Sequence, residues 1–200
     1  DLLSAMVGEF PELQGVMGKY YAAADGESEA TSAAIGEFYW PRFAGDLIPV
    51  SATGRCIAIA DRLDSLVGIF GIGSAPTGDK DPYALRRAAL GTLRILIEGD
   101  IDLDLAEVIK LAFIGYGDMS LGPDTTTLVY NFMRERLRGY YQERGVSADV
   151  CAAVLANNPT SPTEISRRIQ AVIDFASLPE SAALAAANKR IANILKKLAT

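Results

Sequence analysis

The chain has 200 residues, of which 50% are apolar and 22% charged, so it can bury one large core or two small ones. It contains no histidine, which excludes Ser-His-Asp and Cys-His nucleophiles, histidine metal ligands and imidazole acid–base catalysis. The net charge of −6 is uneven: residues 1–125 hold 9 Lys and Arg against 19 Asp and Glu, whereas residues 126–200 hold 10 against 6. An acidic first part and a basic second part indicate two modules with different partners.

The two cysteines, Cys56 and Cys151, lie far apart inside apolar runs. This favours reduced, packed thiols in a cytosolic setting over a disulfide framework. No apolar run reaches the roughly 18–20 residues that a membrane span requires, and no signal peptide opens the chain. We therefore expect a cytoplasmic protein. Because the chain begins without Met inside an amphipathic pattern, we also expect a fragment of a larger protein.

Helical spacing of apolar residues is found in nearly every segment of the first part. It predicts helices over residues 2–10, 11–26, 28–40, 51–73, 82–98 and 103–117. Gly26 and Pro41 are expected stops, and Asp81 is expected to cap a helix that has Pro82 at its first position. The segment 51–73 is the most apolar and is expected to be a buried helix. Its apolar stripe comprises Ile57, Ala60, Leu63, Leu66, Val67 and Phe70.

A Gly-Pro-containing break at residues 119–124 precedes the second part. Four more helices are predicted there, over residues 125–145, 147–157, 161–177 and 180–198. No alternating strand pattern is present, so the predicted fold class is all-α. The break places an expected domain boundary near Gly122 and Pro123, with one domain over residues 1–122 and another over residues 123–200.

The stretch GSAPTGDKD, residues 73–81, is similar to a phosphate-binding loop but departs from it. A working loop has Lys directly after the second glycine and then Ser or Thr for Mg²⁺. Here Asp79 comes before Lys80, and Asp81 replaces the hydroxyl residue. Two carboxylates would repel a triphosphate, and the preceding segment is helical where the motif requires a strand. We therefore interpret the stretch as a glycine-containing corner between two helices.

Two pairs of charged residues in the first part have alternative interpretations. Asp61 and Asp64 share one helix face, so they are either metal ligands or, as we favour, salt-bridging or capping groups. Arg87 and Arg94 also share a face, next to Arg86. These arginines either contact phosphate or pair with protein groups, and the sequence leaves the choice open.

The last predicted helix has the most directional pattern. Its apolar stripe comprises Leu184, Ala187, Ile191, Ile194, Leu195 and Leu198. The remaining face carries Lys189, Arg190, Asn193, Lys196 and Lys197. Such a face suits phosphate contacts, with Asn193 as a candidate base reader. Cations near a helix C-terminus also complement the helix dipole, so solvated lysines are the alternative. Arg134, Arg136, Arg138, Arg144, Arg167 and Arg168 add basic character to this part.

Five separated stretches resemble the beta subunit of bacterial glycyl-tRNA synthetase, in the order of that family. They are GEFPELQGVMGKYYA (8–22), FYWPRFAGDLIP (38–49), ADRLDSLVGIFGIG (60–73), PTGDKDPYALRRAALGTLRILIE (76–98) and AAANKRIANILKK (185–197). Two positions depart from the family pattern: Asp79 stands where Ser is expected, and Phe38 where His is expected.

The resemblance implies a helical HD-like domain followed by the incomplete beginning of a DALR-like anticodon-binding domain. It also implies an α2β2 enzyme that joins glycine to tRNA(Gly), with the class II active site, ATP and Mg²⁺ on the alpha subunit. The fragment is then expected to bind tRNA without catalysing the reaction and to hold no metal or cofactor of its own. The residues expected to contact tRNA are Lys189, Arg190, Asn193, Lys196 and Lys197, with Arg86 and Arg87 as a second group.

Two alternatives remain open at this point. The helices can form a structural scaffold that contacts the rest of the beta subunit or the alpha subunit and never touches RNA. This alternative is serious for the acidic first part, where carboxylates oppose phosphate contact. The other alternative is a degenerate HD-type phosphohydrolase that uses Asp61 and Asp64, although the lack of histidine speaks against that activity.

Overall fold

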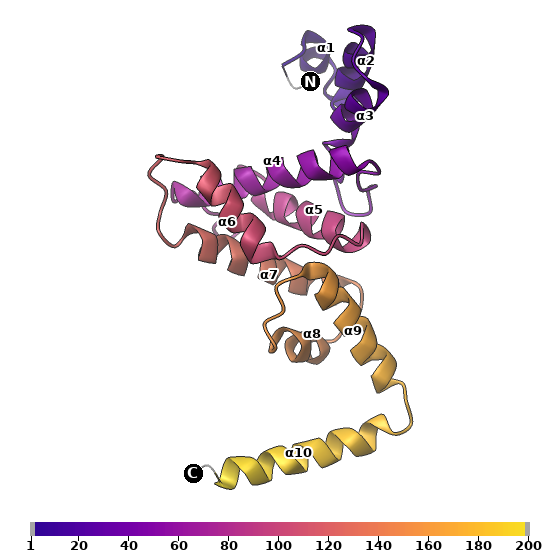
Figure 1. Ribbon diagram of the computed structural model, residues 1–200, viewed down its shortest axis with the longest axis vertical. Helices are drawn as coiled ribbons and strands as arrows, with labels where there is room; N and C mark the ends of the chain where they lie inside the picture. The colour runs from indigo at the N-terminus through magenta and orange to yellow at the C-terminus, as the bar shows by residue number, and fades with distance from the viewer. Residues whose placement is uncertain (1–2, 199–200) are drawn as a thin grey trace.

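The computed structural model describes residues 3–198 and confirms the all-α class. This described part contains ten α-helices and one 3-10 helix, and its β pairing is limited to one isolated bridge between Thr77 and Lys80. Figure 1 shows a body formed by α4 to α7, with α1 to α3 at one end and α8 and α9 at the other. None of the described helices combines the length and apolar character needed to cross a bilayer.

The first helices are short and differ in part from the prediction. They are α1 (Ala5–Glu9), the 3-10 helix η1 (Pro11–Leu13), α2 (Met17–Ala24) and α3 (Glu29–Glu37). The single helix expected over residues 11–26 is wrong, because Gly15 has a φ of +80° and separates η1 from α2. Gly26, with a φ of +86°, follows the end of α2 as predicted. α3 packs on both α2 and α4, which joins this end to the body.

The body has one apolar core contributed by four helices. They are α4 (Ala52–Gly71), α5 (Leu85–Glu98), α6 (Leu105–Gly115) and α7 (Thr125–Glu143). Leu66, Leu93, Ile109 and Met133, one from each helix, are completely buried. α7 follows the expected boundary near Gly122 and packs on α4, α5 and α6, so the core continues past that position. Where one domain ends and the next begins stays a prediction.

The apolar stripe predicted for α4 is only partly buried. Leu63, Leu66, Val67 and Phe70 are in the core. Ile57, however, is 42% exposed, and Ala60 is exposed beside it. The reason is that α3, α5, α6 and α7, which pack on α4, leave the side with these two residues uncovered. The first half of α4 therefore presents apolar side chains to solvent.

The corner between α4 and α5 is a loop with its own hydrogen bonds. Gly73 and Gly78 both have a positive φ, as expected of glycines in such a corner. α5 begins at Leu85 and not at Pro82, because Ala84 has a left-handed φ of +54° that interrupts the helix. The carboxylate of Asp81 still caps the helix, since it accepts hydrogen bonds from the backbone N–H groups of Leu85 at 2.8 Å and Arg86 at 2.9 Å.

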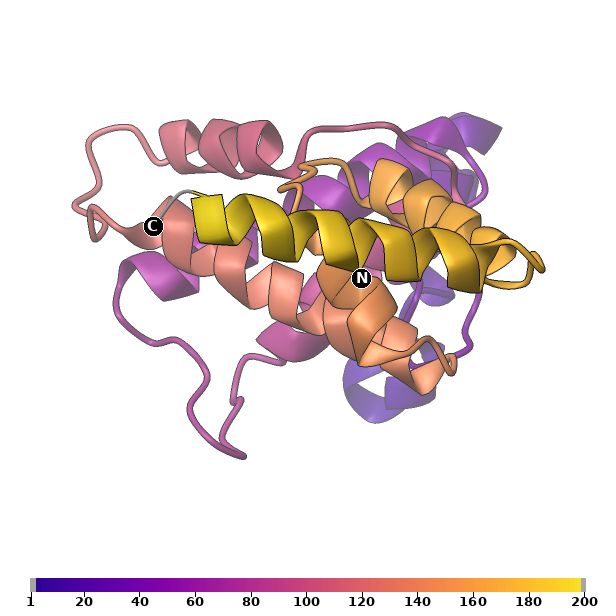
Figure 2. The ribbon, with the colours of Figure 1, turned by 90° about the horizontal axis from the view of Figure 1, so that it is seen from below.

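The remaining helices are α8 (Ala148–Leu155), α9 (Pro162–Ala176) and α10 (Ser181–Leu198). The expected burial of both thiols holds for Cys151 on α8 but not for Cys56 on α4, which is exposed, and neither forms a disulfide. α9 begins as the sequence predicts, with the Ser161 hydroxyl accepting from the backbone N–H of Glu164 and Pro162 at the first position. α10 follows α9 after a short loop; Figure 1 shows it apart from the body, and Figure 2, seen from below, shows it running across under the other helices.

Candidate functional site

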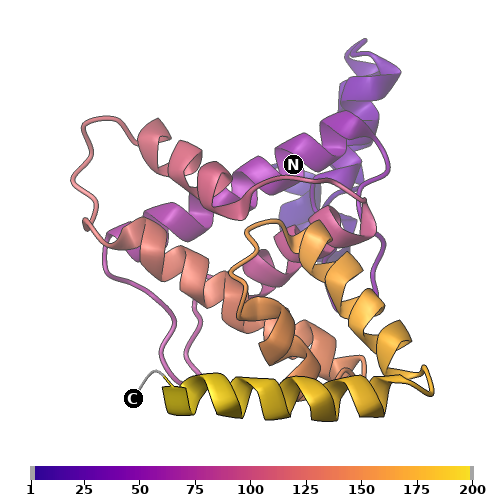
Figure 3. The same ribbon diagram turned by 60° about the horizontal axis from the view of Figure 1, so that its bottom comes forward.

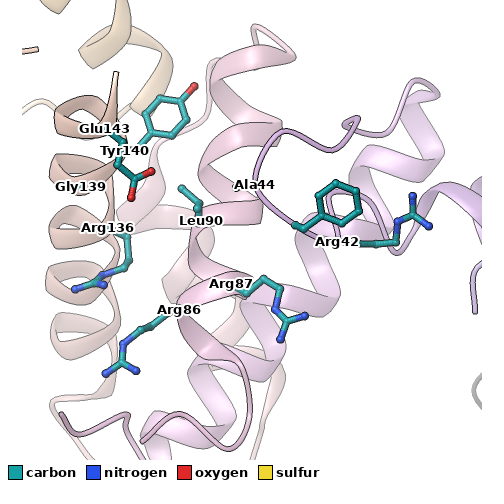
Figure 4. A pocket seen from close by; sticks show the side chains of 10 residues that line it. Arg42, Ala44, Arg86, Arg87, Leu90, Arg136, Gly139, Tyr140 and Glu143 are labelled. Atoms are coloured by element: carbon teal, nitrogen blue, oxygen red, sulfur yellow. The ribbon is translucent and has the colours of Figure 1, made fainter. Parts of the chain in front are cut away.

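Four arginines from three separate segments line one pocket of about 350 Å³ on the body. Arg86 and Arg87 come from the first turn of α5, Arg136 from α7, and Arg42 from the loop between α3 and α4. Figure 4 shows the side chains of Arg86 and Arg136 close to each other, Arg87 pointing away from this pair, and Arg42 farther off on its loop. We call this the arginine pocket. It contains the second group of residues expected to contact tRNA, together with Arg42 and Arg136.

Arg42 is held in place by a buried carboxylate. Its Nε and backbone N–H both donate to Oδ2 of Asp46 at 2.9 Å, and Asp46 is only 8% exposed. These hydrogen bonds from Arg42 lower the pKa of Asp46 to about 2. Asp46 is not among the residues that line the pocket, but its carboxylate offsets part of the charge of Arg42.

Of the other three guanidinium groups, those of Arg86 and Arg136 are held mainly by backbone and aromatic contacts. Arg86 donates to the carbonyl oxygen of Gly78 in the corner. The guanidinium of Arg136 lies 5.5 Å from the ring centroid of Phe132 and 3.5 Å from a carboxylate oxygen of Glu135. Within the described part of the chain, Arg87 forms no ion pair or side-chain hydrogen bond. Its guanidinium is therefore available to an external anion.

The lining of the arginine pocket is strongly cationic for an acidic protein. Its lining residues include four arginines and a single acidic residue, Glu143. Tyr140 also lines the pocket, and burial raises the pKa of its hydroxyl to about 12, so it is neutral at pH 7. Planar guanidinium groups match the oxygen geometry of phosphate. This lining can bind one or more phosphate groups.

Arg94 does not join this group, although the sequence places it on the same face as Arg87. It is 6% exposed, and its Nε donates to Oε1 of Glu98 at 2.7 Å. Its other nitrogens donate to the backbone oxygens of Phe43 at 3.3 Å and Asp46 at 2.6 Å. Arg94 therefore has a structural role: it holds the loop that carries Arg42 against α5.

Asp61 and Asp64 are both exposed on α4. The backbone oxygen of Asp64 accepts a hydrogen bond from the Tyr116 hydroxyl at 2.8 Å. Burial raises the pKa of Asp61, and the positive charge of Arg62 partly opposes this shift. Among the described residues, no group of three or more His, Cys, Asp or Glu side chains lies close enough to bind a metal ion. The arrangement gives the phosphohydrolase alternative no further support.

The first group of expected tRNA contacts lies elsewhere, on α10. Lys189, Arg190, Asn193 and Lys197 are exposed, and the side chain of Lys196 lies outside the described residues. The apolar stripe of this helix is exposed as well, with Leu184, Ile191, Ile194 and Leu195 each more than half exposed. Figure 1 shows α8 and α9 between α10 and the body that contains α5, and Figure 3 shows α10 as a helix of its own along the edge of the fold, so the two groups form separate surfaces.

Sequence reasoning did not connect Arg42 or Arg136 with Arg86 and Arg87. In the sequence, Arg136 is one of six arginines that make the second part basic. Arg42 belongs to the stretch 38–49, which resembles the glycyl-tRNA synthetase beta subunit, and nothing else marks it. The proline and aromatic residues around Arg42 indicate an ordered loop, but no spacing rule places that loop beside α5. The pocket exists because α5 packs against α7 and the Arg42 loop folds over α5.

The chain is similar over its whole length to a known family of proteins. Residues 1–156 match the family model described as glycyl-tRNA synthetase beta subunit. The chain is 54% identical over 201 aligned positions to the glycine–tRNA ligase beta subunit of Acinetobacter baumannii (strain AYE), covering all of this chain and 29% of that relative. It is 54% identical to the same subunit of Colwellia psychrerythraea (strain 34H), over 98% of this chain and 29% of that relative.

The glycine–tRNA ligase beta subunit of Aeromonas hydrophila is 52% identical, over 99% of this chain and again 29% of that relative. The chain thus spans less than a third of the length of these curated relatives. The resemblance noted in the separated sequence stretches is confirmed by an extended match at high identity. On this basis the chain belongs to the glycyl-tRNA synthetase beta subunit family.

Proposed function

We propose that this chain is a tRNA-binding, non-catalytic part of a glycyl-tRNA synthetase beta subunit. In this proposal it holds tRNA(Gly) while the alpha subunit uses ATP and Mg²⁺ to attach glycine, within an α2β2 assembly. The observation that carries the proposal is the arginine pocket, which is lined by four arginines and one glutamate in a chain of net charge −6. A local cationic surface of this kind attracts a polyanion in spite of the acidic total.

Binding in this proposal is mainly electrostatic. Each phosphate that an arginine neutralises releases condensed counterions, so the affinity for tRNA falls as salt is raised. Contacts to phosphate fix the position of the RNA without reading its sequence. The exposed cations of α10 offer a second phosphate surface, with Asn193 as a candidate base reader. A tRNA that contacts both surfaces would be held at two separated points.

The test is the affinity of the complete alpha–beta enzyme for tRNA(Gly), measured over a series of salt concentrations. Arg86→Ala combined with Arg87→Ala is expected to lower the affinity at least tenfold and to reduce the slope of log K against log salt by about 2. The matched control is Arg167→Ala with Arg168→Ala, an adjacent arginine pair on α9. Both control residues are exposed and form ion pairs with Asp100 and Glu164. The control pair is expected to change the slope by less than the α5 pair.

A second variant changes Lys189, Arg190, Lys196 and Lys197 to Ala and tests α10 in the same assay. If neither variant alters the affinity or the salt slope, tRNA binding by this chain is refuted. One observation favours the scaffold alternative in that case: the apolar stripe of α10 is exposed, with Leu195 at 61%. The scaffold predicts that Leu195→Lys disrupts alpha–beta assembly in gel filtration while the basic variants assemble normally.

A further inference from the structure

A second pocket, of about 440 Å³, adjoins the arginine pocket, and two residues line both. Arg42 and Arg87 line both pockets. The second pocket lies on the other side of these two side chains, between α4, the start of α5 and the loop after α3. A ligand long enough to occupy both pockets would pass directly over Arg42 and Arg87.

Aromatic rings distinguish the second pocket, which we call the aromatic pocket. Phe38, Tyr39 and Tyr83 all line it, and Tyr83 is 54% exposed. The rings of Phe38 and Tyr39 are packed edge to face, with centroids 4.8 Å apart. Aromatic side chains are the platforms on which proteins stack unpaired bases of single-stranded RNA.

The backbone of two of the three aromatic residues, Phe38 and Tyr39, is held in position before any ligand binds. The guanidinium of Arg62 reaches from α4 and donates to the backbone oxygens of Phe38 at 3.2 Å and Tyr39 at 3.1 Å. These bonds fix the backbone of the two ring-bearing residues against a rigid helix. A platform that is already ordered loses little conformational entropy when it binds.

The aromatic pocket differs from the arginine pocket in having a carboxylate beside aromatic rings, although Arg42, Arg62 and Arg87 also line it. Asp61 lines it, and within the described part of the chain its carboxylate forms no hydrogen bond or ion pair. A carboxylate repels phosphate but accepts hydrogen bonds from the N–H groups on the edge of a base. The two adjoining pockets therefore suit the two ends of one nucleotide.

We propose that the aromatic pocket binds an unstacked nucleobase of the RNA whose phosphate lies in the arginine pocket. The base stacks on Tyr83, and an edge that offers N–H donors faces Asp61. Arg42 and Arg87 lie between base and phosphate and contact the backbone of the same nucleotide. This inference rests on the proposed tRNA binding and adds a site that reads a base.

The test uses the complete alpha–beta enzyme with tRNA(Gly), probed with dimethyl sulfate and a guanine-specific reagent that modify the base-pairing edges of accessible nucleotides. In the wild-type complex, one unpaired nucleotide is expected to be protected. Tyr83→Ala is expected to restore its reactivity and to lower the affinity roughly tenfold, as for the loss of one stacked base. Tyr21→Ala is the matched control, because Tyr21 is a 42% exposed tyrosine on α2 that lines neither pocket.

A second variant separates base reading from phosphate binding. Asp61→Asn keeps the shape of the side chain but replaces one acceptor oxygen by a donor. It is expected to lower the affinity several-fold with no change in the salt slope, because no phosphate contact is lost. The double variant of Arg86 and Arg87 is expected to change that slope.

The possible results distinguish this inference from the function on which it rests. If the arginine variants reduce the salt slope while Tyr83→Ala and Asp61→Asn leave affinity and base protection unchanged, the base pocket is refuted and phosphate binding stands. If the arginine variants also have no effect, both fail. Thermal unfolding of each variant confirms that the fold is intact, as expected for the exposed Tyr83 and the isosteric change at Asp61.

Discussion

The guanidinium of Arg62 donates a hydrogen bond to the backbone oxygen of Trp40 across 2.9 Å, and so ties α4 to the loop that carries Arg42. The same group also donates to the backbone oxygens of Phe38 and Tyr39, and to Ala58 in its own helix at 2.9 Å. Burial lowers the pKa of Arg62, and the neighbouring Asp61 opposes this shift. Arg62 thus holds the loop segment that contributes to both pockets, and it also lines the aromatic pocket.

Arg62→Lys is expected to destabilise the protein by about 2–4 kcal/mol, because an ammonium cannot bond to carbonyl oxygens that are spread across a planar fork. The measurement is the free energy of unfolding in urea. Arg168→Lys provides the control, since Arg168 forms an exposed ion pair with Glu164 and the change there is expected to cost less than about 1 kcal/mol. Equal stability of the two variants would contradict the role given to Arg62.

The pair formed by Asp46 and Arg42 makes stability depend on pH. The folded state lowers the pKa of Asp46 from 3.8 to about 2, so the carboxylate is stabilising above pH 4, and the stabilisation is lost as pH falls toward 2. At pH 7, Asp46→Asn is expected to lower the free energy of unfolding by about 2 kcal/mol. Urea unfolding at several pH values checks this. The difference between wild type and variant should shrink between pH 4 and pH 2, and a constant difference would contradict an electrostatic origin.

Local signals in the sequence predicted the helices well and the site poorly. Ser161, Pro162 and Glu164 indicate the start of α9 through direct contacts within one turn, so that start was predictable. The start of α5 was not, because the left-handed backbone at Ala84 leaves no mark in residue type. Gly15 separates η1 from α2, whereas helical spacing alone predicted one continuous helix there.

The grouping of functional side chains was beyond sequence reasoning for a different reason. Arg42 and Arg136 meet Arg86 only through the packing of α7 on α5 and through Arg94, which holds the Arg42 loop. Periodicity shows which residues share a helix face but not which face a neighbouring helix covers. The same limit explains why Ile57 and Cys56, in the most apolar helix, are exposed.

The two thiols are expected to react at very different rates. Cys56 is exposed, whereas Cys151 is 3% exposed and burial raises its pKa, with Arg138 opposing the shift. Because the thiolate is the reactive form, iodoacetamide should modify Cys56 in the native protein and leave Cys151 unmodified. Peptide mass spectrometry after timed alkylation identifies each site. Addition of urea should make Cys151 reactive, and rapid native labelling of Cys151 would contradict the packing of α8.

Gly139 offers a way to change the charge of the arginine pocket without disturbing its walls. This residue lies within α7 and lines the pocket, and a Cβ added there would meet nothing within 4 Å. Replacing a glycine inside a helix is expected to stabilise it by about 0.5–1 kcal/mol. Gly139→Glu and Gly139→Gln are therefore both expected to raise the melting temperature of the protein.

The two variants should differ in their affinity for tRNA(Gly). Glu at position 139 places a second carboxylate beside Arg86, Arg87 and Arg136, so it is expected to lower the affinity of the complete enzyme at least tenfold and to reduce the salt slope. Gln has almost the same size and no charge, and its effect is expected to be clearly smaller. Binding curves at several salt concentrations compare the two. If the Glu variant is more stable and still binds tRNA(Gly) like the wild type, then phosphate does not occupy the arginine pocket, and the cations of α10 are left as the candidate RNA surface of this chain.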